Sequence, residues 1–403
     1  MHTAQFEPRS LSQDDLDIAV KNRSNLLGWN GQFSPQLVNG LIANYTSEKS
    51  RLIFDPFAGS ATVANESIAL GHSFHGCEVN PAAFILGNIY GLAAETLLRR
   101  RQIIDYAQQL ISDSELGSPT NIEQIQATSA QTIKWSGCKS SNIVAANILL
   151  NAFRSDQVTS ARSVSRAISK MTEVILGLPR ISTPPTVKLS DARSVNLPNE
   201  HVDLVVTSPP YINVFNYHQQ YRPIIESIGC APLSAARSEI GANRKHRQNR
   251  FLTVIQYCID INRALSEIFR VCKPDARVIL IIGRQSNVLG TALYNGKLLT
   301  EIVQKCYNFK PLLQQERKFV NRFGQLIYED VLHFCAASAV PTETMDNIAR
   351  DVAVSALMST LNEAPEKSKS LLKAACANAS TVLASPLLQE SALNVPDALR
   401  VDL

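Results

Sequence analysis

The chain has 403 residues, of which 45% are hydrophobic and 18% are charged. This composition excludes a wholly disordered chain and is typical of a globular protein with a large core. The length exceeds a single domain of roughly 250 residues, so we expect one core with additions. A formal net charge of +4 permits binding to a polyanion without requiring it.

The eight cysteines are spread along the chain and form no C-x-x-C pair. We therefore expect buried free thiols in a reducing cytoplasm, with no zinc or other metal site. No run of about eighteen apolar residues marks a membrane span, and the first residues lack the apolar centre of a signal peptide. The expected location is cytoplasmic.

The first recognisable unit is a strand followed by a turn of small residues and a helix. Residues 51–54 predict a short buried strand, and residues 55–61 read DPFAGSA. Residues 62–70 predict a helix that ends at Gly71, as glycine commonly ends helices. Small residues in such a turn let backbone N–H groups approach a bound cofactor closely.

A second strand is expected at residues 73–77, and it leads into Glu78. This position lies about twenty residues beyond the turn, where dinucleotide-type folds place a ribose-binding carboxylate. Pro81 then starts another helix. The alternation of strands and helices stops after this helix, and residues 91–180 predict an insertion of helices and loops.

Strands return in the second half of the chain. We expect one at residues 187–190, ending in Asp191, and a continuously apolar, buried one at residues 202–207. Residues 252–272 predict a helix, residues 273–275 a turn and residues 277–282 a further strand.

The end of the chain predicts an antiparallel pair of strands at residues 309–319 and 328–334, and then helices. Four segments are therefore expected. They are the first part of the core (1–90), a helical insertion and candidate target-recognition region (91–185), the rest of the core (186–339) and a helical extension (340–403).

Polar residues follow four of the predicted strands: Asp55, Glu78, Asp191 and Ser208. Ligands of open α/β sheets bind beyond the carboxyl ends of the strands, so one crevice could collect all four. Glu78 could accept both ribose hydroxyls, Asp191 an adenine amine and Asp55 a cationic amino group, the polar groups of S-adenosylmethionine. Taken singly, each acid is more often a turn former or helix cap.

The segment after the apolar strand reads Thr207-Ser208-Pro209-Pro210-Tyr211. Two prolines hold the backbone rigid, aim a carbonyl oxygen and place an aromatic ring where a flat base could stack. The alternative is a strand end that the prolines merely stiffen. The 55–61 turn lacks a Lys-Ser or Lys-Thr pair, which disfavours use of a nucleoside triphosphate.

With these motifs, residues 25–95 and 186–335 resemble the S-adenosylmethionine-dependent DNA amino-methyltransferases, which modify cytosine N4 or adenine N6. The resemblance implies an α/β, Rossmann-like class I methyltransferase fold. This fold has a mostly parallel seven-stranded sheet with an antiparallel closing strand, here joined by the helical insertion and a helical C-terminal tail.

The resemblance also implies roles for individual residues. Residues 28–38 look like the segment beside the methionine carboxylate of the cofactor, and Ala61 stands where glycine is usual. We expect only a modest local shift from this alanine. The implied cofactor-binding residues are Phe33, Ser34, Pro35, Asp55, Phe57, Gly59, Ser60, Glu78 and Asp191. The implied catalytic residues are Ser208, Pro209, Pro210 and Tyr211.

The expected reaction is direct methyl transfer to an exocyclic nitrogen. Methylation at carbon 5 of cytosine needs a cysteine nucleophile, typically after proline, and the chain has no Pro-Cys pair. The target atom is inaccessible inside a duplex, so the base must be flipped, and we assign its stacking to Tyr211. Serine at position 208 resembles the cytosine-N4 subgroup more than the adenine-N6 subgroup.

Expected contacts with double-stranded DNA rest on basic residues within a fourteen-residue run that holds one acid, Glu239. The alternative for this run is a solvated basic loop. Tyr217, with its neighbours His218, Tyr221 and Arg222, could line the mouth for the flipped base or belong to a packed helix. Residues 99–101, three arginines, could join a recognition surface or buttress the fold. The basic residues of the run are Arg237, Arg244, Lys245, Arg247 and Arg250.

Two other functions stay open. One is an RNA base-amine methyltransferase, and the other is an inactive DNA-binding subunit that keeps the fold. For the leading interpretation, a restriction or defence system with a cognate restriction endonuclease is the expected setting. The recognised DNA sequence and the oligomeric state are not determined by these residues.

Overall fold

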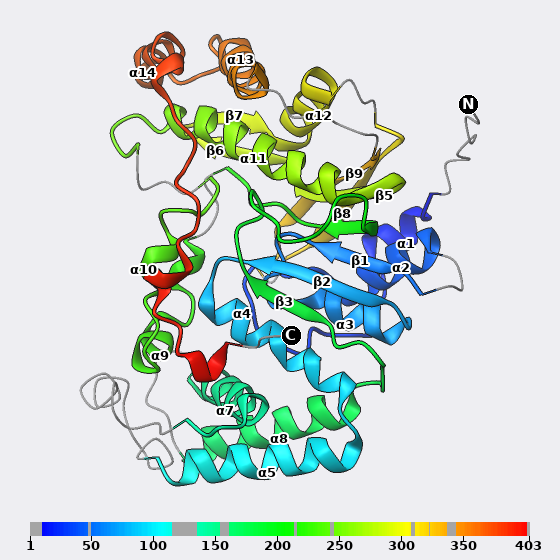
Figure 1. Cartoon of the computed structure of the whole chain (residues 1–403). Helices are drawn as coiled ribbons and strands as arrows, with labels where there is room; N and C mark the ends of the chain where they lie inside the picture. The colour runs from blue at the N-terminus through cyan, green and yellow to red at the C-terminus, as the bar shows by residue number, and fades with distance from the viewer. Residues whose placement is uncertain are drawn as a thin grey trace.

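A computed structural model describes residues 10–46, 50–114, 135–153, 161–212, 216–241, 246–307, 311–321, 323–336 and 344–400. Its centre is a seven-stranded sheet in the order β3-β2-β1-β4-β5-β9-β8 (Figure 1). The strands are β1 (Leu52–Asp55), β2 (Ser73–Glu78), β3 (Thr186–Leu189), β4 (Val202–Thr207), β5 (Cys272–Gly283), β8 (Leu313–Val320) and β9 (Leu326–Cys335).

The first five strands of this order pair in parallel, and β9 runs antiparallel between β5 and β8. The order reverses between β1 and β4, which makes that point the expected ligand crevice. This is the arrangement of a Rossmann-like class I methyltransferase fold, and it confirms the expected fold class, including the antiparallel closing pair.

Helices cover both faces of the sheet (Figure 1). Alternate residues of β5 explain why: Ile279 and Ile281 pack into one core, while Val278 and Leu280 pack into the other. A strand buried on both faces needs apolar residues at every position, which gave the continuous apolar runs in the sequence. The first core includes α2 (Pro35–Tyr45), α3 (Thr62–Ala69) and α4 (Pro81–Gly87); the second includes α11 (Phe251–Val271) and α12 (Asn295–Tyr307).

Three helices of the insertion, α5 (Leu97–Ser112), α7 (Lys139–Ala152) and α8 (Ala161–Gly177), lie together at one end of the molecule (Figure 1). Arg100 is only 1% exposed and ties these helices to the core. Its guanidinium donates to the carbonyl oxygens of Leu92, Ala93, Ile175, Leu178 and Pro179. Of the two uses expected for the three arginines, Arg100 therefore buttresses the fold.

The turn expected at residues 273–275 is wrong, because these residues lie inside β5. The register jumps there from Val202 opposite Cys272 to Leu204 opposite Arg277, which leaves a bulge on β5. Asp275 takes a left-handed conformation with φ of 64°. Lysine, proline and aspartate are typical of turns, and a bulge uses the same local preferences without ending the strand.

A short hairpin was not predicted. Strands β6 (Gln285–Val288) and β7 (Thr291–Tyr294) pair through a tight turn at Leu289 and Gly290, with φ of 51° and 85°. Two positive φ values are typical of a type I′ turn, which asparagine and glycine usually form. Because leucine is unusual in the first position of such a turn, the sequence did not predict the hairpin.

The last part of the chain runs along the whole molecule. Helices α13 (Thr344–Ser359) and α14 (Glu366–Ala377) pack near α11, at the end opposite the insertion (Figure 1). Residues 382–400, here called the C-terminal strap, then pass α10 (Pro232–Ala235) and α9 (Arg222–Ser227) to reach α7, drawn in red in Figure 1. The helical tail therefore continues as a mostly extended segment with two short 3-10 turns, η5 (Glu390–Leu393) and η6 (Asp397–Leu399).

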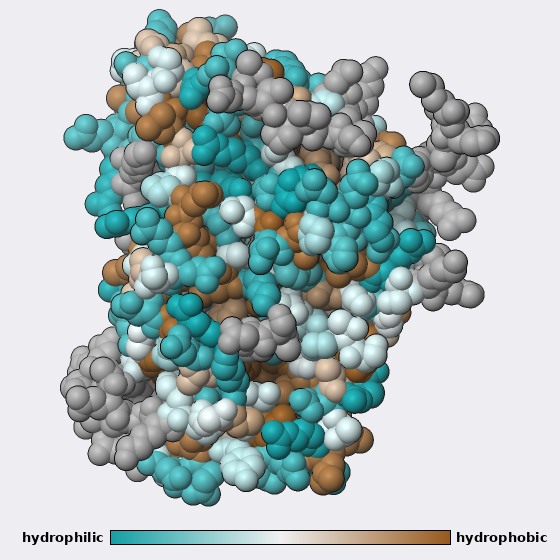
Figure 2. All heavy atoms as spheres, in the orientation of Figure 1, coloured by the Kyte–Doolittle hydropathy of each residue, from teal (hydrophilic) through white to brown (hydrophobic). Residues whose placement is uncertain are grey.

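The remaining short helices are α1 (Gln13–Asp17), η1 (Asn88–Ala94), η3 (Tyr217–Gln219) and η4 (Ala379–Thr381). On the face drawn in Figure 2, hydrophilic and hydrophobic residues are interspersed. All eight cysteines are free thiols. Within the described ranges no helix is long and apolar enough to cross a membrane.

Candidate active site

One cavity lies at the carboxyl edge of the sheet, where the strand order reverses. It brings together the four strand-end residues Asp55, Glu78, Asp191 and Ser208. It is also lined by residues 29–33, residues 56–60 and residues 238–240. Among the predicted site residues, the lining includes Phe33, Phe57, Gly59, Ser60, Pro210, Tyr211 and Tyr217, whereas Ser34, Pro35 and Pro209 lie outside it.

The turn after β1 takes the shape that its small residues allow. Gly59 and Ala61 have left-handed backbones with φ of 52° and 60°. Ala61 directly precedes α3 and keeps the conformation that glycine would adopt there, at a cost of roughly 1 kcal/mol. The alanine that departs from the usual motif therefore adopts a backbone conformation that glycine takes more readily.

Asp55 begins this turn and is 1% exposed. Its Oδ1 accepts hydrogen bonds from the Phe57 backbone N–H at 3.0 Å and the Thr207 hydroxyl at 2.5 Å. Burial raises the pKa of Asp55 to about 7, and these two hydrogen bonds oppose that rise. Thr207 is the last residue of β4, so this bond ties the cofactor turn to the strand that carries the Ser208 motif.

Glu78 ends β2 and faces the same cavity. Its Oε2 accepts from the Gly59 backbone N–H and its Oε1 from the Asn80 backbone N–H, both at 2.8 Å. Burial raises its pKa to about 7, and the hydrogen bonds from Asn80 and Gly59 lower it. A carboxylate oxygen accepts two bonds, so each oxygen keeps one position for a ligand hydroxyl.

The helix α2 begins with Pro35, and Ser34 precedes it in an extended conformation. The Ser34 hydroxyl is buried and has no hydrogen-bond partner within the described part of the chain. First-turn N–H groups of a helix attract anions. An orphaned hydroxyl beside such a helix start fits the carboxylate of a methionine group.

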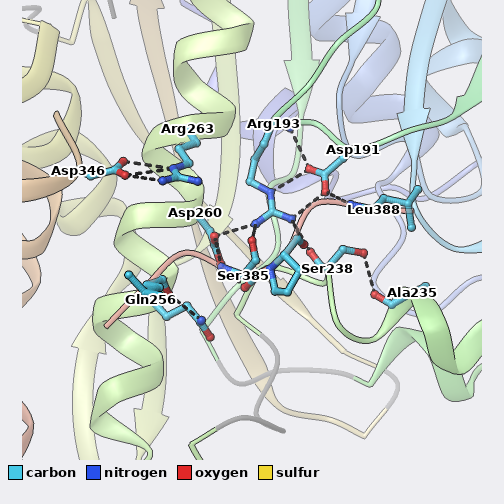
Figure 3. Close-up of polar contacts among 12 residues, drawn as sticks. Asp191, Arg193, Ala235, Ser238, Gln256, Asp260, Arg263, Asp346, Ser385 and Leu388 are labelled. Carbon is cyan, nitrogen blue, oxygen red and sulfur yellow. Dashed lines mark hydrogen bonds and ion pairs between the residues drawn. The ribbon is translucent and has the colours of Figure 1, made fainter. Parts of the chain in front are cut away.

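Asp191 also lines the cavity, but its acceptor positions are filled (Figure 3). Oδ1 accepts from the backbone N–H and the Nε of Arg193, and Oδ2 accepts from Nη2 of Arg193 and the Leu388 N–H. Four donors saturate a carboxylate. The expected contact of Asp191 with an adenine amine would require one of these donors to leave, and Asp191 instead holds the wall of the cavity.

Arg193 is the centre of this cluster, and its side chain is fully buried (Figure 3). Besides Asp191, it pairs with Asp260 of α11 at 2.7 Å. Asp260 in turn accepts from the backbone N–H and the hydroxyl of Ser385 in the C-terminal strap. The guanidinium also donates to the carbonyl oxygens of Ser238, Ser385 and Pro386.

The Ser208 motif follows β4 and enters the cavity beside Gly283, the last residue of β5. The Tyr211 ring lies against Gly283, where an added Cβ would come within 2.8 Å of Cε2. The Tyr211 hydroxyl lies 3.4 Å from the Ser208 Oγ. Burial raises the pKa of Tyr211 well above its usual range, so the phenol stays protonated.

Tyr217, predicted to contact DNA at the mouth for the flipped base, lies in the cavity wall. Its ring is stacked nearly parallel to Trp29, with centroids 6.2 Å apart. Tyr221 is buried and its ring also stacks with Trp29. Its hydroxyl donates to the Gly28 carbonyl at 2.6 Å. Tyr221 therefore follows the alternative of a packed residue after the strand, whereas Tyr217 is both packed and part of the cavity lining.

His218 and Glu239 form a buried pair that the sequence analysis did not identify. Glu239 accepts from the His218 backbone N–H at 2.9 Å and pairs with its Nδ1 at 2.8 Å. Glu239, noted only as the single acid in a basic run, lines the cavity. His218 and Glu239 are twenty-one positions apart in the sequence, so no local spacing predicts that they pair.

The predicted DNA-binding cations are only partly placed. Arg237 and Arg247 are exposed, and Arg250 is partly buried, which lowers its pKa. Arg244 and Lys245 lie outside the described residues. In the described ranges no group of histidine, cysteine and acidic side chains is suited to hold a metal ion.

Comparison with known proteins gives a family match for part of the chain. Residues 13–86 match the family model described as DNA methylase. This range contains the 55–61 turn and Glu78 but ends before Ser208. A comparison with curated proteins found no match. Together with the strand order, the family match supports a methyltransferase.

Several solved structures are similar to this chain at low identity. A SAM-dependent methyltransferase of Methanosarcina mazei is 14% identical, with 73% of this chain and 96% of that chain covered and a TM-score of 0.35. A putative RNA methyltransferase of Pyrococcus horikoshii is 11% identical, with 81% of this chain and 100% of that chain covered and a TM-score of 0.34. A modification subunit of a putative type I restriction enzyme from Vibrio vulnificus is 10% identical, with 76% of this chain and 44% of that chain covered and a TM-score of 0.32. Likenesses at these scores carry no argument about substrate or activity.

The residues of the cavity fit S-adenosylmethionine. Glu78 has one open acceptor position on each oxygen for the ribose hydroxyls. Asp55 Oδ2 accepts no hydrogen bond from the described residues and is open to a cationic amino group, while the buried Ser34 hydroxyl lies just outside the lining, next to Phe33. The same lining carries Ser208 and Tyr211, so a group held by Glu78 and Asp55 faces the predicted catalytic motif.

Proposed function

We propose that this protein is a DNA methyltransferase that transfers a methyl group from S-adenosylmethionine to the exocyclic amine of a flipped base, most favourably cytosine N4. The observation that carries the proposal is the single cavity lined by Asp55, Glu78, Ser208 and Tyr211. Double-stranded DNA is the proposed substrate, and a cognate restriction endonuclease is a candidate partner.

When bound, S-adenosylmethionine supplies an electrophilic methyl group. The protein's part is to make the amine a better nucleophile, because its lone pair is delocalised into the ring. Hydrogen bonds from the amine to the Ser208 hydroxyl, which lines the cavity, and to the carbonyl of Pro209, which lies just outside the lining, would favour a pyramidal nitrogen. Correct positioning supplies most of the remaining acceleration.

Tyr211 has the geometry to position the base. One side of its ring lies against Gly283, so the base would stack on the opposite side. The bond between Thr207 and Asp55 fixes the start of the motif relative to the cofactor turn. Stacking and hydrogen bonding together would hold the amine in line with the methyl group.

The first experiment measures transfer of tritium from labelled S-adenosylmethionine to duplex DNA, followed by mass spectrometry of the nucleosides. We expect N4-methylcytosine from the wild type. We expect a loss of about a hundredfold or more in Ser208→Ala, because the serine hydroxyl contacts the reacting amine. Ser359→Ala, on the exposed end of α13, serves as the control.

Other products separate the alternatives. N6-methyladenine would assign the adenine-N6 reaction. Labelled RNA with unlabelled DNA would assign the RNA base-amine reaction. DNA binding without transfer to either nucleic acid, unchanged in Ser208→Ala, would favour an inactive DNA-binding subunit.

The assignment of Tyr211 has its own test in Gly283→Ala. The added methyl group would lie within 2.8 Å of the ring and would displace it. We expect kcat to fall about tenfold while cofactor affinity stays unchanged, because Gly283 does not line the cofactor side of the cavity. Equal losses in kcat and cofactor affinity would contradict a role limited to the base.

A further inference from the structure

The β8–β9 hairpin extends past the catalytic edge of the sheet. Strand β9 is antiparallel to β5, and Glu329 pairs with Gly283 at the carboxyl end of β5. The backbone N–H of Arg284 still reaches the Tyr328 carbonyl at 3.0 Å. Residues 320, 321 and 323–328 therefore lie beyond Gly283, the residue against which Tyr211 packs.

The tip of this hairpin presents apolar side chains to solvent. Val320 is 65% exposed, Phe323 71%, Leu326 51% and Tyr328 38%. Most large apolar side chains of the described residues are buried, so four such exposures within nine positions form a local feature. Exposed apolar residues gathered in one place mark a surface that contacts a partner.

Hydrogen bonds to Asn321 hold the described residues of the tip. The Asn321 Oδ1 accepts from the backbone N–H groups of Phe323 and Gln325, at 2.9 and 3.0 Å. The Asn321 N–H donates to the Gln325 carbonyl, and Gly324 takes a left-handed backbone with φ of 77°. The backbones of Phe323 and Gln325 are thus both tied to Asn321, which limits the conformational entropy that they lose on binding.

The base of the hairpin is fixed to the catalytic motif. Glu329 forms an ion pair with Arg317 of β8 at 2.5 Å and lies opposite Gly283, against which the Tyr211 ring packs. Leu326 precedes Glu329 by three residues, a distance of about 10 Å along an extended strand. The apolar tip and the ring assigned to the flipped base are therefore held at a fixed separation.

The free edge of β8 is already covered, which argues against pairing with a second copy of the chain. Asp17 of α1 accepts from the Lys318 backbone N–H at 2.8 Å. Gln13 and Gln315 make two more hydrogen bonds between the α1 region and β8. An edge blocked by a helix does not extend a sheet, so the exposed tip, not the edge, is the contact surface.

We propose that the hairpin tip, led by Phe323, inserts into the base stack of duplex DNA at the position that the target base leaves when it is flipped. This inference rests on the proposed function, and it names the element that opens the duplex. Apolar wedges are used in this way to unstack DNA. An aromatic ring can also take over the stacking that the neighbouring bases lose.

The test compares two duplexes that contain the methylated site found by sequencing DNA from expressing cells. In one, the target base is paired, and in the other it faces a mismatched base, so that flipping costs less. Phe323→Ala should lower kcat/KM at least about tenfold on the paired duplex and only about twofold on the mismatched one. The control is Tyr106→Ala, which removes an aromatic side chain that is 62% exposed on α5.

Equal activity of Phe323→Ala and wild type on the paired duplex would overturn the wedge while leaving the proposed function intact. The same loss on both duplexes would also overturn it, since the ring would then act after flipping. A wild type that methylates no DNA would overturn both proposals. A dimer that Phe323→Asp converts to a monomer, measured by light scattering, would assign the tip to self-association instead.

Discussion

Two groups of carboxylates, one facing the cofactor cavity and one in and behind its wall, differ in how their charge is compensated. Asp55 and Glu78 accept hydrogen bonds from backbone and hydroxyl donors only, and burial raises both pKa values to about 7. Asp191 and Asp260 share the fully buried Arg193, and the C-terminal strap donates to both (Figure 3).

The difference separates carboxylates that can bind a ligand from carboxylates that stabilise the fold. A buried carboxylate that lacks a cation and keeps open acceptor positions is destabilising until a ligand supplies the donors. A carboxylate saturated by an arginine has little left to offer a ligand. Acids at strand ends thus have two uses here, and their neighbours decide which one applies.

The largest expected effect comes from removing the cation. Arg193→Met would leave Asp191 and Asp260 buried without their partner, which typically costs about 3–5 kcal/mol. Chemical denaturation should detect this loss in the free energy of unfolding. Adding Asp260→Asn to Arg193→Met should recover part of it, and a loss below about 1 kcal/mol in the single variant would show that the cluster is not structural.

Glu78→Gln tests the opposite group. The amide has one acceptor oxygen, so the ribose hydroxyls lose a partner, and we expect about 10- to 100-fold weaker cofactor binding by titration calorimetry. Folding stability should change by less than about 1 kcal/mol, because a buried charge is removed along with one hydrogen bond. DNA affinity should not change. A parallel loss of DNA affinity would contradict the assigned role.

The pH dependence follows from the raised pKa values of Asp55 and Glu78. Both lie near 7 in the folded chain, above their ordinary values of 3.8 and 4.5, so the folded protein holds protons that the unfolded chain has released. The stability from these protons is present at low pH and is lost as pH rises through about 7. A cationic amino group favours ionised Asp55, so cofactor affinity should rise over the same range.

Thermal unfolding and cofactor titration between pH 6 and 8 should therefore change in opposite directions. We expect roughly a tenfold gain in cofactor affinity from this ionisation. Asp55→Asn serves as the control, because it removes one titrating group and should flatten both profiles. Cofactor affinity that is constant over this range in the wild type would contradict the assignment.

The smallest effect is expected from Ser385→Ala. It removes one hydrogen bond to Asp260, while the Ser385 backbone N–H and Arg193 still donate to that carboxylate. We expect a loss of about 1 kcal/mol in the free energy of unfolding and unchanged cofactor affinity. Ser359→Ala is the matched control, and a marked loss of cofactor affinity would place the strap within the binding machinery.

Much of the fold followed from local patterns. The turn at residues 55–61, Glu78 and the strand before Ser208 were predicted because each depends on residues that are neighbours in the sequence. The sheet order then brings their strand ends together, as open α/β sheets do. Asp55, Glu78, Asp191 and Ser208 all reach the cavity.

The parts that were missed depend on contacts between distant residues. Arg193 binds Asp260, 67 positions away, and Ser385 of the strap, 192 positions away. Nothing in the neighbouring sequence distinguishes it from a surface arginine. Among the described residues Arg100 forms no ion pair with an acid; it binds five carbonyl groups, which leave no sequence signal. Gly283 matters only because the Tyr211 ring lies against it.

The C-terminal strap has a consequence for the order in which the protein forms during translation. Asp191, Arg193 and Asp260 leave the ribosome well before Ser385 and Leu388, which complete their hydrogen bonds. Until the strap arrives, the nascent chain keeps two of its buried acids short of donors. The wall beside the cofactor cavity is therefore finished late, after both the turn and the Ser208 motif have been synthesised.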